Sequence, residues 1–375
     1  MALSKVDLAN QVENQLPQSL VADNVNYRNI MINGDMSIAQ RGTSFSSVSA
    51  GNGTYPVDRF RNNMTGAGTW TISQDTTVPT VQGFAKSVKY DCTTADASLA
   101  AGDFLILQQL IEGQNLQYLK KGTSSAESLT VSFWVRSNKT GTYISELYDE
   151  DNTRNISQSY TISSANTWEK KTITFAGDTS GALNNDNGAS LTLNFWLAAG
   201  SNYTSGTLNT SWNSNTNANR AVGQVNLADS TDNEWYVTGV QLEAGTSASD
   251  FEFLPYDVNL KRCMRYFERT TAVGASDNYV NFAAGLVQTS SYCSYCFLWK
   301  VTKRANPTMS TTAASTFLNE NGGSYPAGTS ISFSQMNKTS VQMNVESSSG
   351  LTLGNGALLK SNGTYDAYID ASAEL

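Results

Sequence analysis

The 375-residue sequence contains no histidine. This absence excludes the Ser-His-Asp and Cys-His catalytic arrangements and every metal site built on imidazole. Cysteine is also scarce, with Cys92, Cys263, Cys293 and Cys296 as its four members. Cys293 and Cys296 form a C-x-x-C pair without a second pair nearby, so a four-ligand zinc site is not expected. An odd spacing on a strand places the two side chains on opposite faces. We therefore predict buried free cysteines, no cofactor and no catalytic metal.

Charge and long apolar runs are scarce as well. Only 15% of the residues are charged, and the net charge is −8. The Lys and Arg residues form no basic cluster, and binding to phosphates depends on such clustered cations. No apolar run approaches the length of a membrane-spanning helix, and MALSKVDLAN lacks the apolar region of a cleaved signal peptide. We predict a soluble protein that is made in a cytosol, with no nucleic-acid partner and no membrane insertion.

Polar uncharged residues and aromatic residues take the place of charge. Ser, Thr, Asn, Gln and Gly are abundant, and 10% of the residues are aromatic. This mixture is typical of all-β proteins with polar strand faces and turn-rich loops. The length indicates two or three domains.

Short alternating runs separated by turn residues predict one β-sandwich between Thr69 and Gly245. Two of the runs nearly repeat: SLTVSFWVR from Ser128 and SLTLNFWLA from Ser190. Each places four apolar residues on one side, as the inner faces of two packed sheets require. These residues are Leu129, Val131, Phe133 and Val135 in the first run, and Leu191, Leu193, Phe195 and Leu197 in the second. Trp134 and Trp196 are then expected on the outer faces.

The stretch 235–269 joins two β-rich parts of the chain. WYVTGVQLE predicts a strand that is covered on both sides, with Tyr236 and Leu242 on the same face. After Pro255 the pattern changes, and Asp257 offers a carboxylate for a helix N-cap. An apolar stripe at helical spacing runs from Leu260 through Cys263 and Met264 to Phe267, so we expect a short helix here.

Two N-terminal features have alternative interpretations. Residues 1–26 form a polar leader with a thin helical stripe, either a frayed tail or a peptide for attachment and oligomerisation. Asp35, Arg41, Asp58 and Arg59 are charges set among apolar neighbours. We expect them to form a paired, partly buried network; a catalytic carboxylate pair is the less favoured alternative.

Three separated motifs resemble a family of phage tail-fibre and other virion appendage proteins. The first is YRNIMINGDMSIAQRGTS followed by YPVDRF. The second is a tryptophan-containing strand, GVQLE-G, FE and a helix ending in C-x-RYF. The third is KRANPTMS with the terminal AYIDASAEL. The strand order of the sandwich is also similar to the jelly-roll of carbohydrate-binding modules of cellulases and xylanases.

The expected architecture is therefore all-β, with a jelly-roll sandwich and a C-terminal β domain joined by a short helix. Its parts are a leader (1–26), a jelly-roll sandwich (27–250), a linker with the helix (251–272) and a C-terminal β domain (273–375). The resemblance implies a structural virion component, such as a tail fibre, exposed on the particle and recognising host-surface glycans. It also implies a homotrimer that attaches through its N-terminus to other tail or capsid proteins.

Aromatic residues on polar loops are the candidate ligand-binding residues, because sugar C–H faces stack on rings while hydroxyls bond to amides. Tyr203 and Trp212 lie in SNYTSGTLNTSWNSNTNAN, although the favoured alternative is that Trp212 folds back to close the core. Tyr279 and Tyr325 are the candidates in C-terminal loops.

One acidic cluster is a weak calcium candidate. Asp149, Glu150 and Asp151 carry the hard oxygen ligands that calcium prefers. The favoured alternative is a solvated hairpin turn, because Asp and Asn supply turns. No catalytic residue is predicted, and the protein is not expected to be an enzyme. The alternative functions are a capsid decoration or head-fibre protein, and a glycan depolymerase, which would need two paired carboxylates.

Overall fold

The computed structural model describes residues 27–272, 279–363 and 366–375, so the predicted leader 1–26 lies outside the described residues. The chain divides into two compact units. The first contains the described residues up to Met36, Ser44–Thr54 and Asn62–Leu254; the second contains Ser37–Thr43, Tyr55–Arg61 and Pro255–Leu375. Within the described part, no helix is long and apolar enough to cross a membrane.

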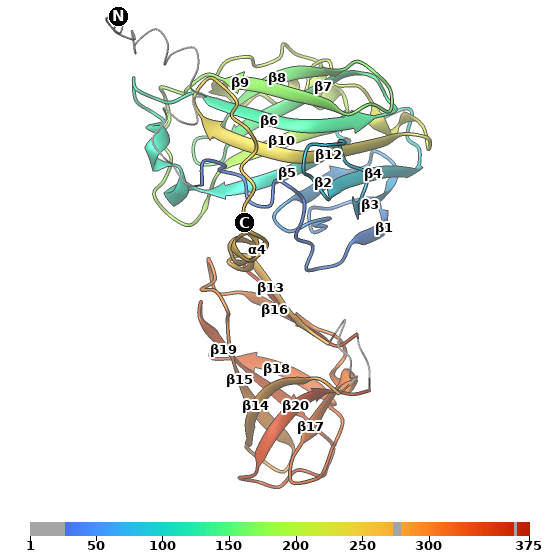
Figure 1. Cartoon of the computed structure of the whole chain (residues 1–375), viewed down its shortest axis with the longest axis vertical. Coiled ribbons are helices and arrows are strands. Elements are labelled where there is room, and N and C mark those ends of the chain that lie inside the picture. Colours follow the sequence, from blue (N-terminus) through green and yellow to red (C-terminus); the bar gives the residue numbers. More distant parts are fainter. Residues whose placement is uncertain (1–26, 273–278, 364–365) are drawn as a thin grey trace, which may run out of the picture. The chain divides into compact units, whose positions relative to one another are not determined.

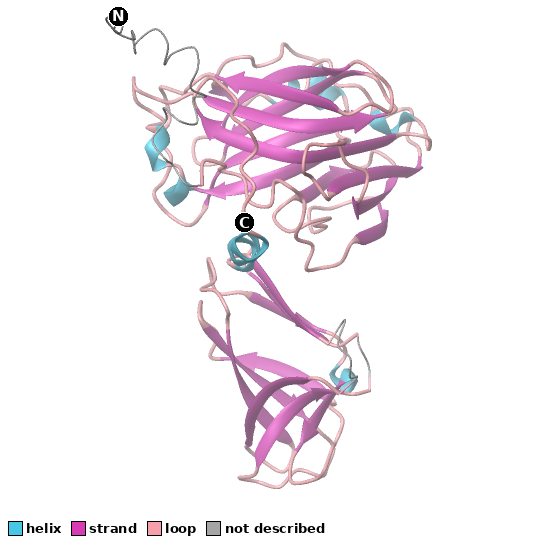
Figure 2. Ribbon diagram, viewed as in Figure 1, coloured by secondary structure: helices cyan, strands magenta, loops and turns pink. Residues whose placement is uncertain are grey.

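The first unit is a sandwich of two six-stranded antiparallel sheets (Figures 1 and 2). The chain crosses between the two sheets repeatedly, and only the consecutive pairs β3–β4, β7–β8 and β10–β11 stay within one sheet. The predicted fold class, an all-β chain with a sandwich and a second β region, is confirmed. In spatial order, sheet A consists of β1 (Ser44–Val48), β3 (Thr69–Asp75), β4 (Ser87–Thr94), β12 (Glu234–Ala244), β6 (Leu129–Ser137) and β9 (Glu169–Phe175). Sheet B consists of β11 (Asn213–Ser214), β8 (Arg154–Ile162), β7 (Gly141–Asp149), β10 (Ala189–Ala199), β5 (Phe104–Glu112) and β2 (Arg61–Thr65).

The two near-repeated runs form the predicted inner faces. SLTVSFWVR contributes β6 of sheet A, SLTLNFWLA contributes β10 of sheet B, and all eight ladder residues are buried. Phe133 and Phe195 meet between the sheets with ring centroids 4.9 Å apart, and Phe195 also contacts Trp235 at 6.2 Å. Burying each such ring stabilises the fold by roughly 1.5–3 kcal/mol.

The predicted faces of β12 are wrong beyond its midpoint. Tyr236 lies opposite Arg136 of β6, whereas Leu242 lies opposite Val131, whose side chain faces the core. The register shifts between Thr238 and Gln241, and Gly239 between them has a positive φ of 63°. This bulge inserts an extra residue and reverses the alternation, so Tyr236 and Leu242 face opposite sides.

The second unit contains two further antiparallel sheets. One has three strands in the order β13 (Phe267–Thr271), β21 (Tyr368–Ser372) and β16 (Thr308–Thr311). The other has six, in the order β17 (Phe317–Glu320), β20 (Gly356–Ser361), β14 (Asn281–Val287), β15 (Tyr292–Leu298), β19 (Ser340–Glu346) and β18 (Ser330–Ser334). Tyr295, Met343 and Leu359 are fully buried in their core. The predicted β18–β19 hairpin and the terminal strand are confirmed.

The predicted helix is shorter than its apolar stripe indicated. It is α4 (Tyr256–Met264), and Pro255 occupies the N-cap position without a side-chain hydrogen bond. Asp257 lies in the first turn, where it pairs with Lys261 at 3.6 Å instead of capping the backbone. Phe267 is buried as expected, but it begins β13 rather than continuing the helix.

Short helical turns complete the first unit, with a further one in the second. They are η1 (Gly113–Asn115), η2 (Gln117–Leu119), α3 (Ser201–Thr204), η3 (Asn217–Asn219), η4 (Leu227–Asp229) and η5 (Ala314–Thr316). Residues 27–43 contain turns and bends but no helix or strand, and β1 begins at Ser44. Polar side chains in such a segment form hydrogen bonds with nearby backbone groups, and these bonds compete with the backbone pairing of a strand.

Three of the four residues predicted to form a charged network, Arg41, Asp58 and Arg59, form ion pairs in the second unit, together with Glu374, which the sequence did not reveal. Asp58 and Arg59 are almost fully buried, and Arg41 lies 3.7 Å from the Asp58 carboxylate. Glu374 pairs with both Arg41 and Arg59. Burial raises the pKa of Asp58 to about 6, although Arg41 and hydrogen bonds from Gln40 act in the opposite direction.

The cysteines are free thiols, as expected, but they are not all buried. Cys92, Cys263 and Cys293 are buried, whereas Cys296 is exposed on β15. The prediction of opposite faces for Cys293 and Cys296 is confirmed, and that alternation is the reason why Cys296 faces outward.

Candidate functional site

The outer face of sheet A carries a tryptophan among polar residues. Trp134 of β6 lies opposite Thr238 of β12 on one side and Lys170 of β9 on the other. One row further, Ser132 lies opposite Gln241. These residues project away from the core, because their sequence neighbours form the inner ladder. Ser132, Trp134 and Lys170 among them provide the floor of a pocket.

The loop between β3 and β4, residues 76–86, forms one wall of this pocket. The Thr238 hydroxyl donates a hydrogen bond to the Lys86 carbonyl oxygen at 2.7 Å. At the base of the loop, the Ser87 hydroxyl donates to the Thr77 carbonyl oxygen at 2.7 Å. The loop is therefore fixed to the sheet at its end, and its tip extends over the outer face.

The bulge at Gly239 lets a phenylalanine ring lie directly on the sheet. A Cβ atom at Gly239 would lie 2.5 Å from Cζ of Phe84, closer than real side chains approach. Phe84 is almost fully buried by this packing. The absence of a side chain at Gly239 thus sets the position of the ring.

The segment after β12 forms the opposite wall. Gln241 donates to the Ser249 hydroxyl at 3.0 Å and to the Asp250 carbonyl oxygen at 3.2 Å, and it accepts from the Glu252 amide at 2.8 Å. The Glu243 carboxylate accepts hydrogen bonds from the Ser249 amide and hydroxyl, both at 2.8 Å. Polar residues on the outer face of β12 therefore hold this segment against the sheet.

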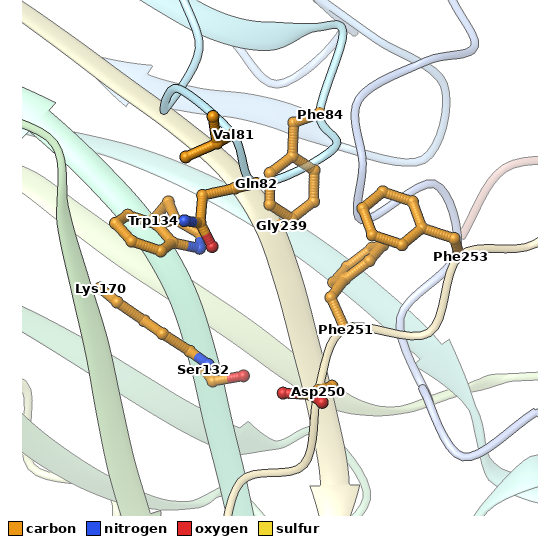
Figure 3. A pocket seen from close by; sticks show the side chains of 10 residues that line it. All are labelled: Val81, Gln82, Phe84, Ser132, Trp134, Lys170, Gly239, Asp250, Phe251 and Phe253. Carbon is orange, nitrogen blue, oxygen red and sulfur yellow. The ribbon is translucent and has the colours of Figure 1, made fainter.

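Between these walls lies a pocket of about 340 Å³, which we call the Trp134 pocket (Figure 3). Its volume falls within the range of small-molecule sites. Ten residues line it: Val81, Gln82, Phe84, Ser132, Trp134, Lys170, Gly239, Asp250, Phe251 and Phe253. Figure 3 shows three phenylalanines gathered on one side, with Trp134 and Gln82 next to each other on the other. The pocket thus joins aromatic surface with an amide, a hydroxyl, an ammonium and a carboxylate.

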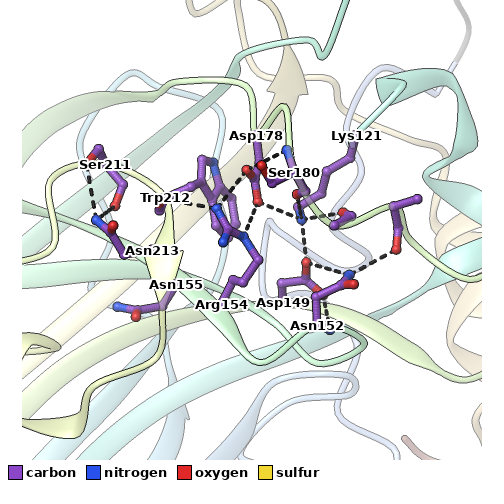
Figure 4. Close-up of polar contacts among 12 residues, drawn as sticks. Lys121, Asp149, Asn152, Arg154, Asn155, Asp178, Ser180, Ser211, Trp212 and Asn213 are labelled. Carbon is purple, nitrogen blue, oxygen red and sulfur yellow. Dashed lines mark hydrogen bonds and ion pairs between the residues drawn. The ribbon is translucent and has the colours of Figure 1, made fainter. Parts of the chain in front are cut away.

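Trp212, one of the predicted binding residues, directly precedes β11 and is held by a charged network (Figure 4). Its indole N–H donates to the Ala176 carbonyl oxygen at 2.7 Å. The Lys121 ammonium lies 4.9 Å from its ring centroid, and Arg154 donates to its carbonyl oxygen at 3.2 Å. These contacts agree with the alternative interpretation, in which Trp212 closes the structure beneath it.

Tyr203, although on the same long loop, belongs to a different cluster. Its ring lies 5.5 Å from Phe104 and 5.3 Å from Trp196, centroid to centroid. The indole N–H of Trp196 donates to Glu146 at 3.0 Å, and Arg220 pairs with the same carboxylate at 2.8 Å. Tyr203 thus helps to cover the outer face of sheet B. The structure does not bring Tyr203 and Trp212 together into one site.

The two C-terminal candidates lie in the second unit. Tyr279 is 51% exposed and Tyr325 is 54% exposed. The Lys360 ammonium lies 5.9 Å from the Tyr325 ring centroid. Both tyrosines remain accessible to a ligand.

The three acidic residues of the calcium candidate have separate partners. Asp149 is fully buried and pairs with Lys121, Glu150 accepts from the Thr192 hydroxyl at 2.6 Å, and Asp151 accepts from the Asn184 amide at 2.9 Å. Their carboxylates therefore serve different contacts. Among the described residues, no cluster of three or more acidic residues and cysteines is placed to hold a metal ion.

The alternation along β6 predicts Trp134 on an outer face, but it does not indicate a site there. A large aromatic residue on the polar face of an alternating strand was the available signal, because such positions usually carry polar residues. Val81, Gln82 and Lys170 gave no signal of their own. They become neighbours only through the folded loop and the β6–β9 pairing.

The fold and this pocket define a class: a jelly-roll protein with an aromatic, hydroxyl-lined pocket on one sheet. No family model and no curated protein sequence matches the chain. Solved structures resemble part of it. Over 53% of this chain, the enzymatically active domain of tailspike protein 4 of bacteriophage CBA120 aligns at 16% identity and a TM-score of 0.29, with 21% of that chain covered.

Two carbohydrate-binding modules align over a similar share. TmCBM61 in complex with β-1,4-galactotriose covers 58% of this chain and 99% of its own, at 10% identity and a TM-score of 0.29. The family 11 module from Clostridium thermocellum, in complex with a mixed-linked tetrasaccharide, covers 55% and 99%, at 11% identity and a TM-score of 0.28.

Proposed function

We propose that this protein binds a surface glycan in the Trp134 pocket and that it does so as an appendage of a phage particle. The observation that carries the binding proposal is the pocket itself, in which an aromatic ring lies among Ser132, Gln82, Lys170 and Asp250. Sugars have apolar C–H faces that stack on rings and hydroxyl edges that form hydrogen bonds. The pocket offers both kinds of contact in one place.

The binding proposal is tested by comparing two tryptophan variants. Trp134→Ala removes the ring from the pocket, while Trp212→Phe changes a tryptophan that does not line it. Purified proteins that retain the wild-type circular dichroism spectrum are assayed for binding to host cells and to extracted surface polysaccharide. Trp134→Ala should weaken binding at least tenfold, and Trp212→Phe should leave it unchanged. Full binding by folded Trp134→Ala would reject the pocket as the site.

The protein binds glycan without cleaving it. Of the described residues that line the pocket, Asp250 alone carries a carboxylate. Most glycosidases position two carboxyl groups about 5–10 Å apart. Release of new reducing ends from host polysaccharide by the purified protein would contradict this part of the proposal.

The location on the particle and the trimeric state rest on the sequence resemblance to phage appendage proteins. The protein is a tail fibre or related appendage that is exposed on the particle, with the N-terminal leader attaching it to neighbouring virion proteins. Immunogold labelling of intact particles tests the location, since capsid labelling would indicate a decoration protein instead. Light scattering tests the trimer: a monomeric mass at micromolar concentration would contradict it.

A further inference from the structure

One half of the Trp134 pocket has more apolar surface than a hexose without apolar substituents would contact. Phe84, Phe251 and Phe253 form a triangle with ring centroids 5.0, 5.1 and 4.8 Å apart. Phe84 is nearly buried, but Phe253 is 50% exposed at the rim. Since Trp134 already offers a surface for the face of a sugar ring, this second apolar wall is available for another apolar group of the ligand.

Val81 extends the apolar half in a way that the fold alone does not explain. It is 99% exposed and adopts a left-handed φ of 57°. A β-branched residue is strained in this region, where glycine is not. With its side chain in solvent, Val81 gains no packing in the free protein that would offset the strain. Strained residues that persist at a pocket rim indicate a contact made with a ligand.

The polar half of the pocket contains groups that the protein leaves available. Among the described residues, the side chains of Gln82, Lys170 and Asp250 form no hydrogen bond or ion pair with one another or with any neighbour. Asp250 is positioned through its backbone, whose carbonyl oxygen accepts from Gln241. The pocket therefore presents acceptors on Asp250 and Gln82 and donors on Gln82 and Lys170 that a ligand can use.

We propose that the Trp134 pocket selects a sugar that carries an N-acetyl group, an inference that rests on the proposed glycan binding. The methyl of the N-acetyl group packs on Phe253 and Val81. The amide N–H of the N-acetyl group donates to the Asp250 carboxylate, and the carbonyl oxygen of the same group accepts from Gln82 or Lys170. A sugar with a hydroxyl in the same position has no methyl to pack on the apolar wall, so the wall stays exposed to water. The apolar wall and the free donor and acceptor groups are all used only by the N-acetylated sugar.

The test uses pairs of immobilised oligosaccharides that differ only in an N-acetyl group replaced by hydroxyl, in the gluco, galacto and manno series. The whole chain should bind at least one N-acetylated member tenfold or more tightly than its partner. Val81→Gly and Phe253→Ala should remove this preference, while Trp134→Ala should weaken binding to both members. Val81→Gly should also resist urea at least as well as wild type, because glycine relieves the strained backbone.

Equal or weaker binding of every N-acetylated member overturns the inference, and so does a preference that survives in Val81→Gly and Phe253→Ala. A third arm uses the free-amine sugars. If these bind best, Asp250 recognises an ammonium rather than an amide, and the inference fails. If no member binds while host cells are still bound in a Trp134-dependent way, the N-acetyl preference fails and the proposed function stands. Loss of Trp134-dependent cell binding would instead overturn both.

Discussion

Replacing Lys121 with Met should strongly destabilise the sandwich. The Lys121 side chain is 7% exposed, and its ammonium pairs with Asp149 and lies 2.9 Å from Asp178. It also donates to the Gly181 carbonyl oxygen at 2.8 Å. Without the ammonium, two buried carboxylates lose a cation, and breaking a buried pair in this way costs about 3–5 kcal/mol.

The adjacent residue offers a matched control. Lys120 pairs with Glu127, but the two side chains are 54% and 41% exposed. Surface pairs contribute about 0–1 kcal/mol, so Lys120→Met should remain close to wild type. Adding Asp149→Asn to Lys121→Met should recover part of the loss, because a neutral amide is less costly to bury than an unpaired carboxylate.

Urea unfolding followed by tryptophan fluorescence measures both variants. Six of the seven tryptophans belong to the sandwich unit, with Trp299 the one in the second unit, so the signal reports mainly on the sandwich. A difference between Lys121→Met and Lys120→Met of less than about 1 kcal/mol, the surface range, would refute the buried network.

Two further predictions concern the thiols and Asp58. Native protein should react with one equivalent of a thiol reagent through Cys296, and with four in denaturant. Burial raises the pKa of the Cys92 thiol to about 11, and burial also shields Cys263 and Cys293 from the reagent. Reaction of a second thiol in the native protein, or reaction of native Cys296→Ser, would contradict this prediction. Asp58 has a folded pKa of about 6, above its ordinary value, so the folded state binds the proton more tightly. The Asp58 contribution to stability is therefore greatest at low pH and declines as pH rises from about 4 to 6. The stability of Asp58→Asn relative to wild type should rise by roughly 1–3 kcal/mol across that window; a flat or falling difference in urea unfolding would contradict the sign.

Local patterns were enough to predict the sandwich. The alternation that places Phe133 and Phe195 inside depends only on the period of two along a strand, which the sequence displays directly. The bulge at Gly239 was harder to place. A glycine within a strand indicates a bulge, yet the reversal of faces beyond it becomes certain only when Leu242 is seen opposite Val131.

The site depends on proximity between segments that are remote in sequence. Val81 and Phe253 line one pocket although 172 positions separate them, and nothing in either local pattern indicates the other. The same applies to Lys121, whose partner Asp149 was assigned to a solvated turn. A buried ion pair is formed by tertiary packing, so sequence composition predicted the acidic cluster but not the lysine that neutralises it.

Gly239 connects the fold to the pocket, and its replacement tests that connection. In Gly239→Ala, the left-handed φ of 63° would strain the alanine backbone by about 1–2 kcal/mol. The new methyl would also displace the Phe84 ring, which lies 2.5 Å from the Cβ position. Both effects act on the bulge, so glycan binding should fall together with stability. Gly53→Ala is the matched control, because no atom lies within 4 Å of its Cβ position.

The two alanine variants are compared by urea unfolding and by binding to host polysaccharide. Gly53→Ala should stay within about 1 kcal/mol of wild type, since alanine also restricts the unfolded chain. Gly239→Ala should lose stability and bind more weakly even when assayed at a temperature where it remains folded. Equal binding by the two folded variants would show that the Phe84 ring does not shape the site. The ligand would then contact the outer face of sheet A without the loop that the bulge supports.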